Sequence, residues 1–180
     1  MPAPRGKMTV ELRDATKADA ATLAALGSRT FTDTFGHLYD PDDLDLFLKN
    51  HAEEHWAAEL CDPEYGVLLV EVPSESGPEA VGYAKVGPPH LPFEPRGIAV
   101  ELRQFYLIKD WQGRGIADEM MHWVIDQAEQ RKGDDLYLSV FVDNIRARKF
   151  YERWGFVAEG RYAFMVGTHA DEDIVMRRPL

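Results

Sequence analysis

Cysteine and positive charge are scarce in this chain of 180 residues. Cys61 is the single cysteine, which excludes an internal disulfide and is typical of a reducing, cytoplasmic location. No nucleophilic pattern surrounds Cys61, so we expect a buried or inert thiol. The 20 basic residues face 31 acidic ones, a net charge of −11. This balance argues against nucleic acids and anionic membranes as partners, because both favour basic patches, and it suits a cationic substrate.

Long apolar runs are missing as well. No stretch approaches the length of a membrane span, and residues 1–7 carry charge and prolines without the apolar core of a secretory signal. Hydrophobic residues make up 45% of the chain and charged residues 28%, which is ordinary for a globular protein. We therefore expect residues 1–180 to form one domain with a full hydrophobic core.

Two common phosphate-binding motifs are absent. There is no Gly-Lys-Ser/Thr of a P-loop, and the third small residue of a dinucleotide fingerprint is missing. A glycine-bearing turn lies instead between an apolar run, 105–108, and an amphipathic run, 120–130. This turn is Gln112-Gly113-Arg114-Gly115-Ile116-Ala117. A strand leading through it into a helix would offer free amides and a helix dipole to pyrophosphate, although an ordinary tight turn is the alternative.

Apolar periodicity and turn signals predict alternating helices and strands. Helices are expected at 20–35, 41–60 (with a break near Asn50), 114–131 and 145–154. Strands are expected at 10–13, 66–72, 80–86, 98–108, 136–142, 156–166 and 173–177, with a hairpin loop at 73–78 and a proline-bearing loop at 87–97. No internal repeat or linker is evident.

Two segments resemble motifs of the GNAT superfamily of N-acetyltransferases. Residues 106–117 are similar to its strand–(Gln/Arg)-x-x-Gly-x-(Gly/Ala)–helix signature, and residues 144–156 to its Asn-x-x-Ala-x-x-(Phe/Leu)-Tyr-x-x-x-Gly-Phe. The resemblance implies an α/β fold with a mixed, mostly antiparallel seven-stranded sheet and about four helices. Acetyl-CoA would enter a splay between the strands ending at Ile108 and starting near Leu136. It further implies no metal, a possible homodimer, and direct transfer without an acyl-enzyme.

Further segments resemble the polyamine (spermidine/spermine) acetyltransferase-like branch. They are Leu12–Thr16, Phe31–Phe35, Tyr39, and Phe164–Gly167 followed by Asp173. Together with the acidic balance, they favour a small primary amine such as a polyamine as acceptor. The alternatives are a protein or peptide N-terminus or lysine, and, from another class, a non-catalytic acyl-CoA-binding module.

The resemblance also implies roles for individual residues. Tyr151 would protonate the departing thiolate, with a core tyrosine as the alternative. Glu101 is the candidate base, although a solvated strand-end carboxylate is the alternative and Gln104 could order a water instead. A backbone N–H near Leu107, where the family has a bulge, would meet the oxyanion. The residues expected to bind the cofactor are Leu107, Ile108, Gln112, Gly113, Arg114, Gly115, Ile116, Ala117 and Asn144, of which Asn144 could equally be a helix cap.

The acceptor pocket and the charges around the cofactor complete the expectations. Phe35 and Tyr39, with Trp56, would line the acceptor pocket or belong to the core. His51 and His55 invite a zinc site, but they do not match His-Glu-x-x-His, and a solvated helix face is expected. Asp118 departs from the family pattern, since a carboxylate beside the pyrophosphate is unfavourable unless it points away. The positive charges that could offset the cofactor phosphates are Arg114, Arg148 and Lys149.

Overall fold

The computed structural model describes residues 9–49 and 51–180, so the break expected near Asn50 falls outside the described residues. The strands are β1 (Glu11–Asp14), β2 (Gly66–Ser74), β3 (Gly77–Gly87), β4 (Ala99–Leu107), β5 (Asp135–Phe141), β6 (Val157–Val166) and β7 (His169–Pro179). The α-helices of the described part are α1 (Ala20–Phe35), α2 (Pro41–Lys49), α3 (Glu53–Cys61), α4 (Ile116–Gln130) and α5 (Ile145–Arg153). The expected seven-stranded fold is confirmed, with the segment 41–61 divided into two helices.

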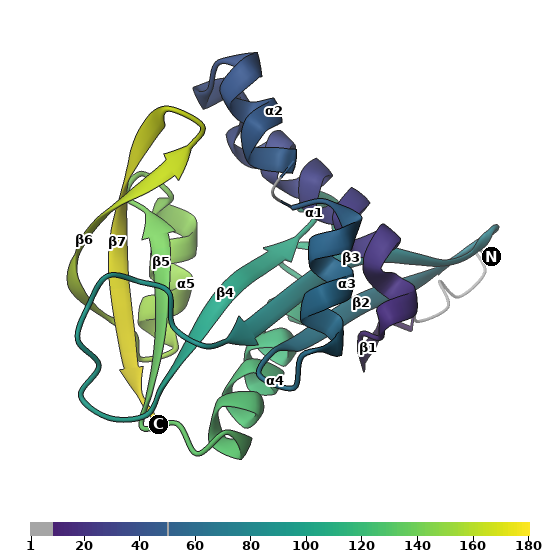
Figure 1. Ribbon diagram of the computed structural model, residues 1–180. Helices are drawn as coiled ribbons and strands as arrows, with labels where there is room; N and C mark the ends of the chain where they lie inside the picture. The colour runs from purple at the N-terminus through teal and green to yellow at the C-terminus, as the bar shows by residue number, and fades with distance from the viewer. Residues whose placement is uncertain (1–8, 50) are drawn as a thin grey trace, which may run out of the picture.

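The strands form one mixed sheet in the order β1-β2-β3-β4-β5-β7-β6. Only β4 and β5 pair in parallel, and the other neighbours are antiparallel. The parallel ladder is short, joining Ala99–Glu101 to Asp135–Tyr137. Beyond it the two strands diverge, as Figure 1 shows, and the sheet opens at its centre.

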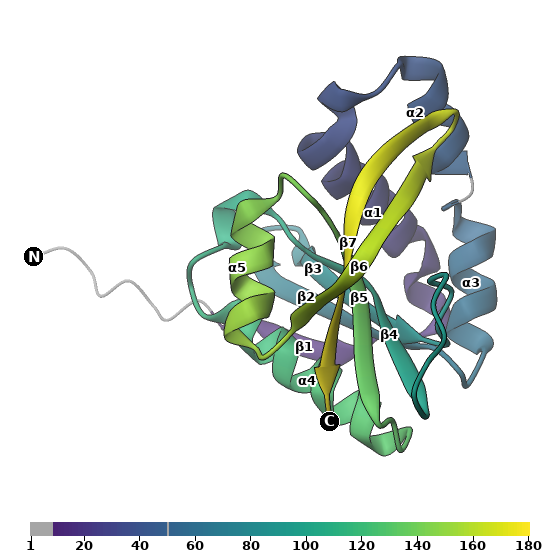
Figure 2. The ribbon, with the colours of Figure 1, turned by 90° about the vertical axis from the view of Figure 1, so that its left-hand side faces the viewer.

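Helices cover both faces of the sheet (Figures 1 and 2). On one face, α4 and α5 pack over the largest core, in which Met120, Met121 and Leu136 are fully buried. On the other face, α1 and α3 cover β2 and β3 through Leu23, Leu26 and Trp56. The fold buries these apolar stripes because each helix carries its hydrophobic residues on one side. Figure 2 shows α2 next to the tip of the β6–β7 hairpin, where its side chains join Phe164 and Val166.

A bulge in β4 changes which side chains face which helices. Lys85 pairs with Gln104 and Val86 with Leu102, so Arg103 is the extra residue. An inserted residue reverses the alternation of side chains along a strand. Before Arg103, Leu102 points into the core beneath α4; after it, Tyr106 points to the α1 and α3 face. The bulge expected near Leu107 is therefore misplaced, since Leu107 itself pairs regularly with Gly82.

Three smaller expectations can also be compared with the structure. The hairpin loop is shorter than 73–78, because β2 and β3 continue to Ser74 and Gly77, where a φ of 109° suits glycine. Cys61, the last residue of α3, is exposed, so of the expected buried or inert thiol the buried alternative is wrong. No helix in the described part of the chain is long and apolar enough to cross a membrane.

Candidate active site

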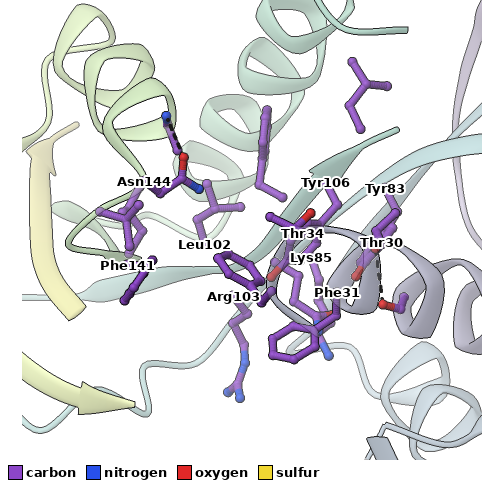
Figure 3. A pocket seen from close by; sticks show the side chains of 18 of the residues that line it. Thr30, Phe31, Thr34, Tyr83, Lys85, Leu102, Arg103, Tyr106, Phe141 and Asn144 are labelled. Atoms are coloured by element: carbon purple, nitrogen blue, oxygen red, sulfur yellow. Dashed lines mark hydrogen bonds between the residues drawn. The ribbon is translucent and has the colours of Figure 1, made fainter. Parts of the chain in front are cut away.

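A cleft of about 1280 Å³ occupies the opening between β4 and β5. Its lining includes residues from both faces of the sheet: Asn144 and Tyr151 at the cap and on the body of α5, and Tyr39 and Tyr106 on the α1 side. Figure 3 shows Asn144 and Phe141 across the cleft from Tyr83, Tyr106 and Lys85. The cleft therefore connects the two faces through the sheet, and ligands approaching from opposite faces could meet there.

The glycine turn forms one wall of this cleft. Gly113 and Gly115 have φ values of 74° and 83°, a left-handed conformation that side chains other than glycine rarely adopt. A Cβ at either position would meet no atom within 4 Å, so the backbone conformation, and not crowding, requires glycine here. Gln112 fixes the turn to the end of β4, because its Nε2 donates to the Leu107 carbonyl at 2.8 Å. Gly115 is the N-cap of α4 and places the helix N-terminus at the cleft.

Replacing Gly115 with alanine should therefore weaken this turn. We expect Gly115→Ala to lower the free energy of unfolding by about 1 kcal/mol and to raise the KM for acetyl-CoA, because φ must leave the left-handed region. Chemical denaturation and initial-rate kinetics measure the two effects. Gly160→Ala is the matched control, since Gly160 has no neighbour within 4 Å and no positive φ. Equal effects of the two substitutions would contradict a special role for the turn.

Most residues expected at the cofactor site line the cleft, and two do not. Leu107, Ile108, Gln112, Gly113, Gly115, Ala117 and Asn144 are in its lining. The side chain of Ile116 is buried in the core beneath the sheet, so only its backbone could serve a ligand. The guanidinium of Arg114 lies 4.8 Å from the ring of Trp111, away from the lining.

The edge of β4 exposes backbone groups to the opening. In the β3–β4 ladder, Ile108 N donates to Val81 O at 2.9 Å, which makes Leu107 and Phe105 non-hydrogen-bonded positions. Their N–H and C=O groups consequently point away from β3, toward the gap that β5 leaves. The N–H of Leu107 thus faces the cleft in regular strand geometry, without the help of a local bulge.

Tyr151 lies on α5 in an aromatic cluster. Its ring packs against Phe105, Phe150 and Phe156 at centroid distances of 6.3, 5.6 and 5.7 Å. Burial, with a smaller effect of Tyr106, raises the pKa of Tyr151 above its ordinary value, so the phenol keeps its proton. Tyr151 also lines the cleft, and it is therefore both a packed tyrosine and an available proton donor.

Glu101 is not the solvated carboxylate that the alternative interpretation predicted. Glu101 is 7% exposed and lines the cleft. It is the last residue of β4 that pairs with β5. Its Oε2 accepts the backbone N–H of His90 at 2.5 Å, which draws the proline-bearing loop over β4. Gln104 lies further along the same strand, and its buried Oε1 has no hydrogen-bond partner in the described structure.

Asn144 and Asp118 each have partners that bear on the cofactor site. Asn144 caps α5 by accepting the Ala147 N–H at 3.2 Å, as the capping alternative predicted, which leaves its amide NH₂ to donate (Figure 3). Asp118 accepts from Trp154 Nε1 at 3.1 Å and from Arg153 at 3.3 Å. Its carboxylate is thereby directed to α5 and balanced by a guanidinium, which weakens the objection to an acid at this position.

The expected acceptor residues occupy the α1 side of the cleft. Phe35 and Tyr39 line it, and Trp56 lines it while belonging to the core under α3. His51 and His55 do not share a helix, because His51 lies between α2 and α3. His51 packs 4.4 Å from the ring of Phe47, and burial lowers its pKa, so the expected solvated face is wrong there. No group of three or more His, Cys, Asp or Glu could hold a metal ion in residues 9–49 and 51–180.

Several buried polar residues of the cleft were not predicted as site residues. Asp171 and Asp173 on β7 are 8% and 6% exposed and line the cleft. Lys85 on β3 is buried, paired with Glu59, and lies 4.5 Å from the ring of Trp56. Asp173 was noted only as part of the branch resemblance, and the alternation of β7, with acids at two positions of one face, could have signalled the pair. Lys85 carries no such signal, because its partners lie on a distant helix.

The fold and the cleft together define the class of N-acetyltransferases with a centrally splayed sheet. Residues 28–156 match the Acetyltransferase (GNAT) family, which covers most of the chain. The chain therefore belongs to the GNAT family, and it is an N-acetyltransferase.

Relatives and solved structures agree with this assignment. An uncharacterized N-acetyltransferase of Mycobacterium tuberculosis is 31% identical over 163 residues, 90% of this chain and 98% of the relative. The spermine/spermidine N(1)-acetyltransferase of Bacillus subtilis is 33% identical over only 88 residues, 48% of this chain and 58% of that protein. The fold is similar to that of PaiA N-acetyltransferase from Thermoplasma acidophilum in complex with coenzyme A, with a TM-score of 0.74, 16% identity, and 96% of this chain and 100% of that chain covered. It is also similar to that of NAA60 of Arabidopsis thaliana in complex with a bisubstrate analogue, with a TM-score of 0.69, 16% identity, and 96% of this chain and 99% of that chain covered.

Proposed function

We propose that this N-acetyltransferase moves the acetyl group of acetyl-CoA directly to a small primary amine, most readily a polyamine. The observation that carries the proposal is the cleft through the sheet, with a glycine turn on the α4 side and acidic residues on the α1 side. The buried Asp171 and Asp173 in its lining suit a cation, and the partial similarity to the spermine/spermidine enzyme supports the same acceptor class.

The residues around the turn fit the phosphates of coenzyme A. The left-handed glycines leave the backbone N–H groups uncovered, and the α4 N-terminus adds the positive end of a helix dipole. These local donors would act against the overall charge of −11, which ionic screening reduces over about 8 Å. Arg148 contributes less than expected, since its guanidinium donates to the Val142 carbonyl at 3.0 Å. The amide of Asn144 and the backbone of Leu107 and Ile108 would hold the pantetheine arm.

The chemistry requires a neutral amine, because an ammonium has no lone pair with which to attack. An alkyl amine with a pKa of about 10.4 costs about 4–5 kcal/mol to keep neutral at pH 7. Glu101 would take the proton from the amine, directly or through a water that Gln104 orders. When bound, acetyl-CoA supplies the acetyl group as an activated thioester.

Bond formation and cleavage balance when the nitrogen gives up two protons and the sulfur gains one. A nitrogen–carbon bond forms to the acetyl carbon while its carbon–sulfur bond breaks. The N–H of Leu107 stabilises the negative charge on the carbonyl oxygen, and Tyr151 donates its proton to the departing sulfur. Glu101 takes one proton from the ammonium before the attack, and the nitrogen loses a second proton once its bond to the acetyl carbon has formed. Both protons pass to solvent, and solvent restores the phenol of Tyr151. No protein group becomes acetylated, so an isolated acetyl-enzyme would contradict this route.

An assay of thiol release from acetyl-CoA tests the proposal across polyamines, single amino acids and peptides. We expect turnover with the polyamines and identification of the N-acetylated product by mass. A peptide or protein amine is the second candidate acceptor, favoured by the fold similarity to NAA60, and turnover on peptides alone would establish it. Binding of acetyl-CoA without turnover of any acceptor would replace both with a binding module.

A further inference from the structure

The two aspartates of β7 form a buried acidic pair on the acceptor side of the cleft. Asp171 and Asp173 are separated by one residue, so they point to the same face of the sheet. Asp173 stands opposite Phe141 of β5 and Tyr162 of β6, both of which also line the cleft. The pair is therefore directed into the opening and not into the core under α4.

The negative charge of this pair is incompletely balanced. Asp171 accepts a hydrogen bond from the Tyr39 hydroxyl, and the exposed His169 ring lies 3.2 Å from it. Asp173 has the Ser139 hydroxyl beside it and takes part in no ion pair within residues 9–49 and 51–180. Burying a carboxylate without a cationic partner is unfavourable, so a ligand that brings a positive charge would gain binding energy here.

The surroundings of the pair suit an ammonium group. Tyrosines converge on it from three elements: Tyr39 before α2, Tyr106 on β4 and Tyr162 on β6. Burial raises the pKa of all three phenols, and the charge of Asp173 adds to the rise, with Asp171 contributing more than Asp173 at Tyr39. The three phenols therefore remain neutral. Aromatic faces and carboxylates together are the usual recognition elements for an alkylammonium ion.

We infer that Asp171 and Asp173 determine acceptor specificity by binding a second, protonated amino group of a diamine or polyamine. This inference rests on the proposed function, because it requires a small amine as acceptor. One nitrogen of the acceptor loses its proton and reaches the thioester beside β4. The other nitrogen keeps its proton, and its positive charge balances the negative charge of the β7 pair. Monoamines of the same length lack that contact.

The test compares putrescine with n-butylamine, which has the same carbon chain and a single nitrogen. We expect the wild type to prefer putrescine in kcat/KM. Asp173→Asn should reduce kcat/KM for putrescine about 10- to 100-fold, mainly through KM, as for a lost hydrogen bond to a charged group. The same substitution should leave n-butylamine nearly unchanged, and Asp171→Asn should act in the same direction.

Glu172→Gln is the matched control, because Glu172 lies between the two aspartates on the opposite face and pairs with Arg161. Its putrescine kinetics should equal those of the wild type. Titration with acetyl-CoA and thermal unfolding show whether each variant is folded. Equal losses on both amines, or no preference for putrescine in the wild type, would overturn the inference. Failure of every amine would instead contradict the proposed function.

The pH dependence offers an independent readout of the same pair. Burial, and then the neighbouring Asp171, raises the pKa of Asp173 to about 6, while Ser139 opposes the shift. Other titratable groups facing Asp173 are Tyr39, Tyr106, Tyr162 and, beyond Asp171, His169. Protonation below that pKa removes the negative charge, so the preference for putrescine should decline as the pH falls through about 6. Asp173→Asn should abolish this decline, and its persistence would count against Asp173.

Discussion

Tyr151→Phe should lower kcat by about 10²–10⁴-fold while the KM for acetyl-CoA changes little, if the phenol donates the proton to the departing sulfur. The substitution removes only the hydroxyl, and the ring can keep its packing against Phe105, Phe150 and Phe156. Because burial raises the pKa of Tyr151, no loss of activity from its ionisation is expected below its ordinary pKa of about 10. Steady-state kinetics with the best acceptor measure the effect.

Tyr137→Phe is the control for this prediction. Tyr137 is also buried and stacks on Phe93 at 4.0 Å, but it is outside the lining of the cleft. It should keep the wild-type kcat, although both variants lose one phenolic hydroxyl. A Tyr151→Phe enzyme with full kcat would show that the thiolate leaves without help from this residue, or takes its proton from solvent.

Glu101→Gln should lower kcat/KM for the amine by about 10²-fold at neutral pH, if Glu101 removes the proton. Glutamine has nearly the same shape, and its amide oxygen can still accept the His90 N–H that the carboxylate accepts now. The fold of the proline-bearing loop should therefore be preserved, and the loss of activity measures the contribution of Glu101 as a base. The deficit should shrink as the pH approaches the pKa of the amine, because more of the amine is then already neutral.

The exposed Glu94 of the same loop provides the comparison, and Glu94→Gln should have wild-type kinetics. An unchanged kcat/KM for Glu101→Gln across the pH range would transfer the role of base to a water chain. In that event Gln104, whose buried Oε1 has no partner in the described structure, is the next residue to replace.

Local sequence patterns predicted the positions of most strands and helices, and the family resemblance supplied the mixed sheet and the residues expected at the cofactor site. Glycine at positions 113 and 115 indicates a left-handed backbone, because other residues rarely adopt it. Tyr151 and Asn144 were identified from a motif that spans one helix and its cap. These features depend on neighbours in sequence, which is why a pattern can indicate them. The spacing of Leu23, Leu26 and Phe31 likewise predicted the α1 helix, and all three residues are buried.

The acceptor side depends on contacts between distant segments, and the sequence indicated it only in part. Tyr39 meets Asp171 across 132 positions of sequence, and Lys85 meets Glu59 across 26. The β4 bulge was misplaced because register depends on the partner strand, and no residue type in 98–108 marks an insertion. The solvated helix face expected for His51 is wrong for a local reason, because α2 ends at Lys49 and the ring of His51 packs against Phe47.

The extra residue at Arg103 has a consequence for engineering this enzyme. Because it changes the phase of β4, two groups of positions on one strand can be varied separately in directed evolution. Glu101, Gln104 and Tyr106 line the cleft without belonging to the core beneath α4, Val100 belongs only to that core, and Leu102 belongs to both. A library that assumed strict alternation from Val100 onward would keep Gln104 and Tyr106 fixed as core residues. It would vary Phe105 and Leu107, which pack on the core, and would therefore lose folded variants while leaving Gln104 and Tyr106 unsampled.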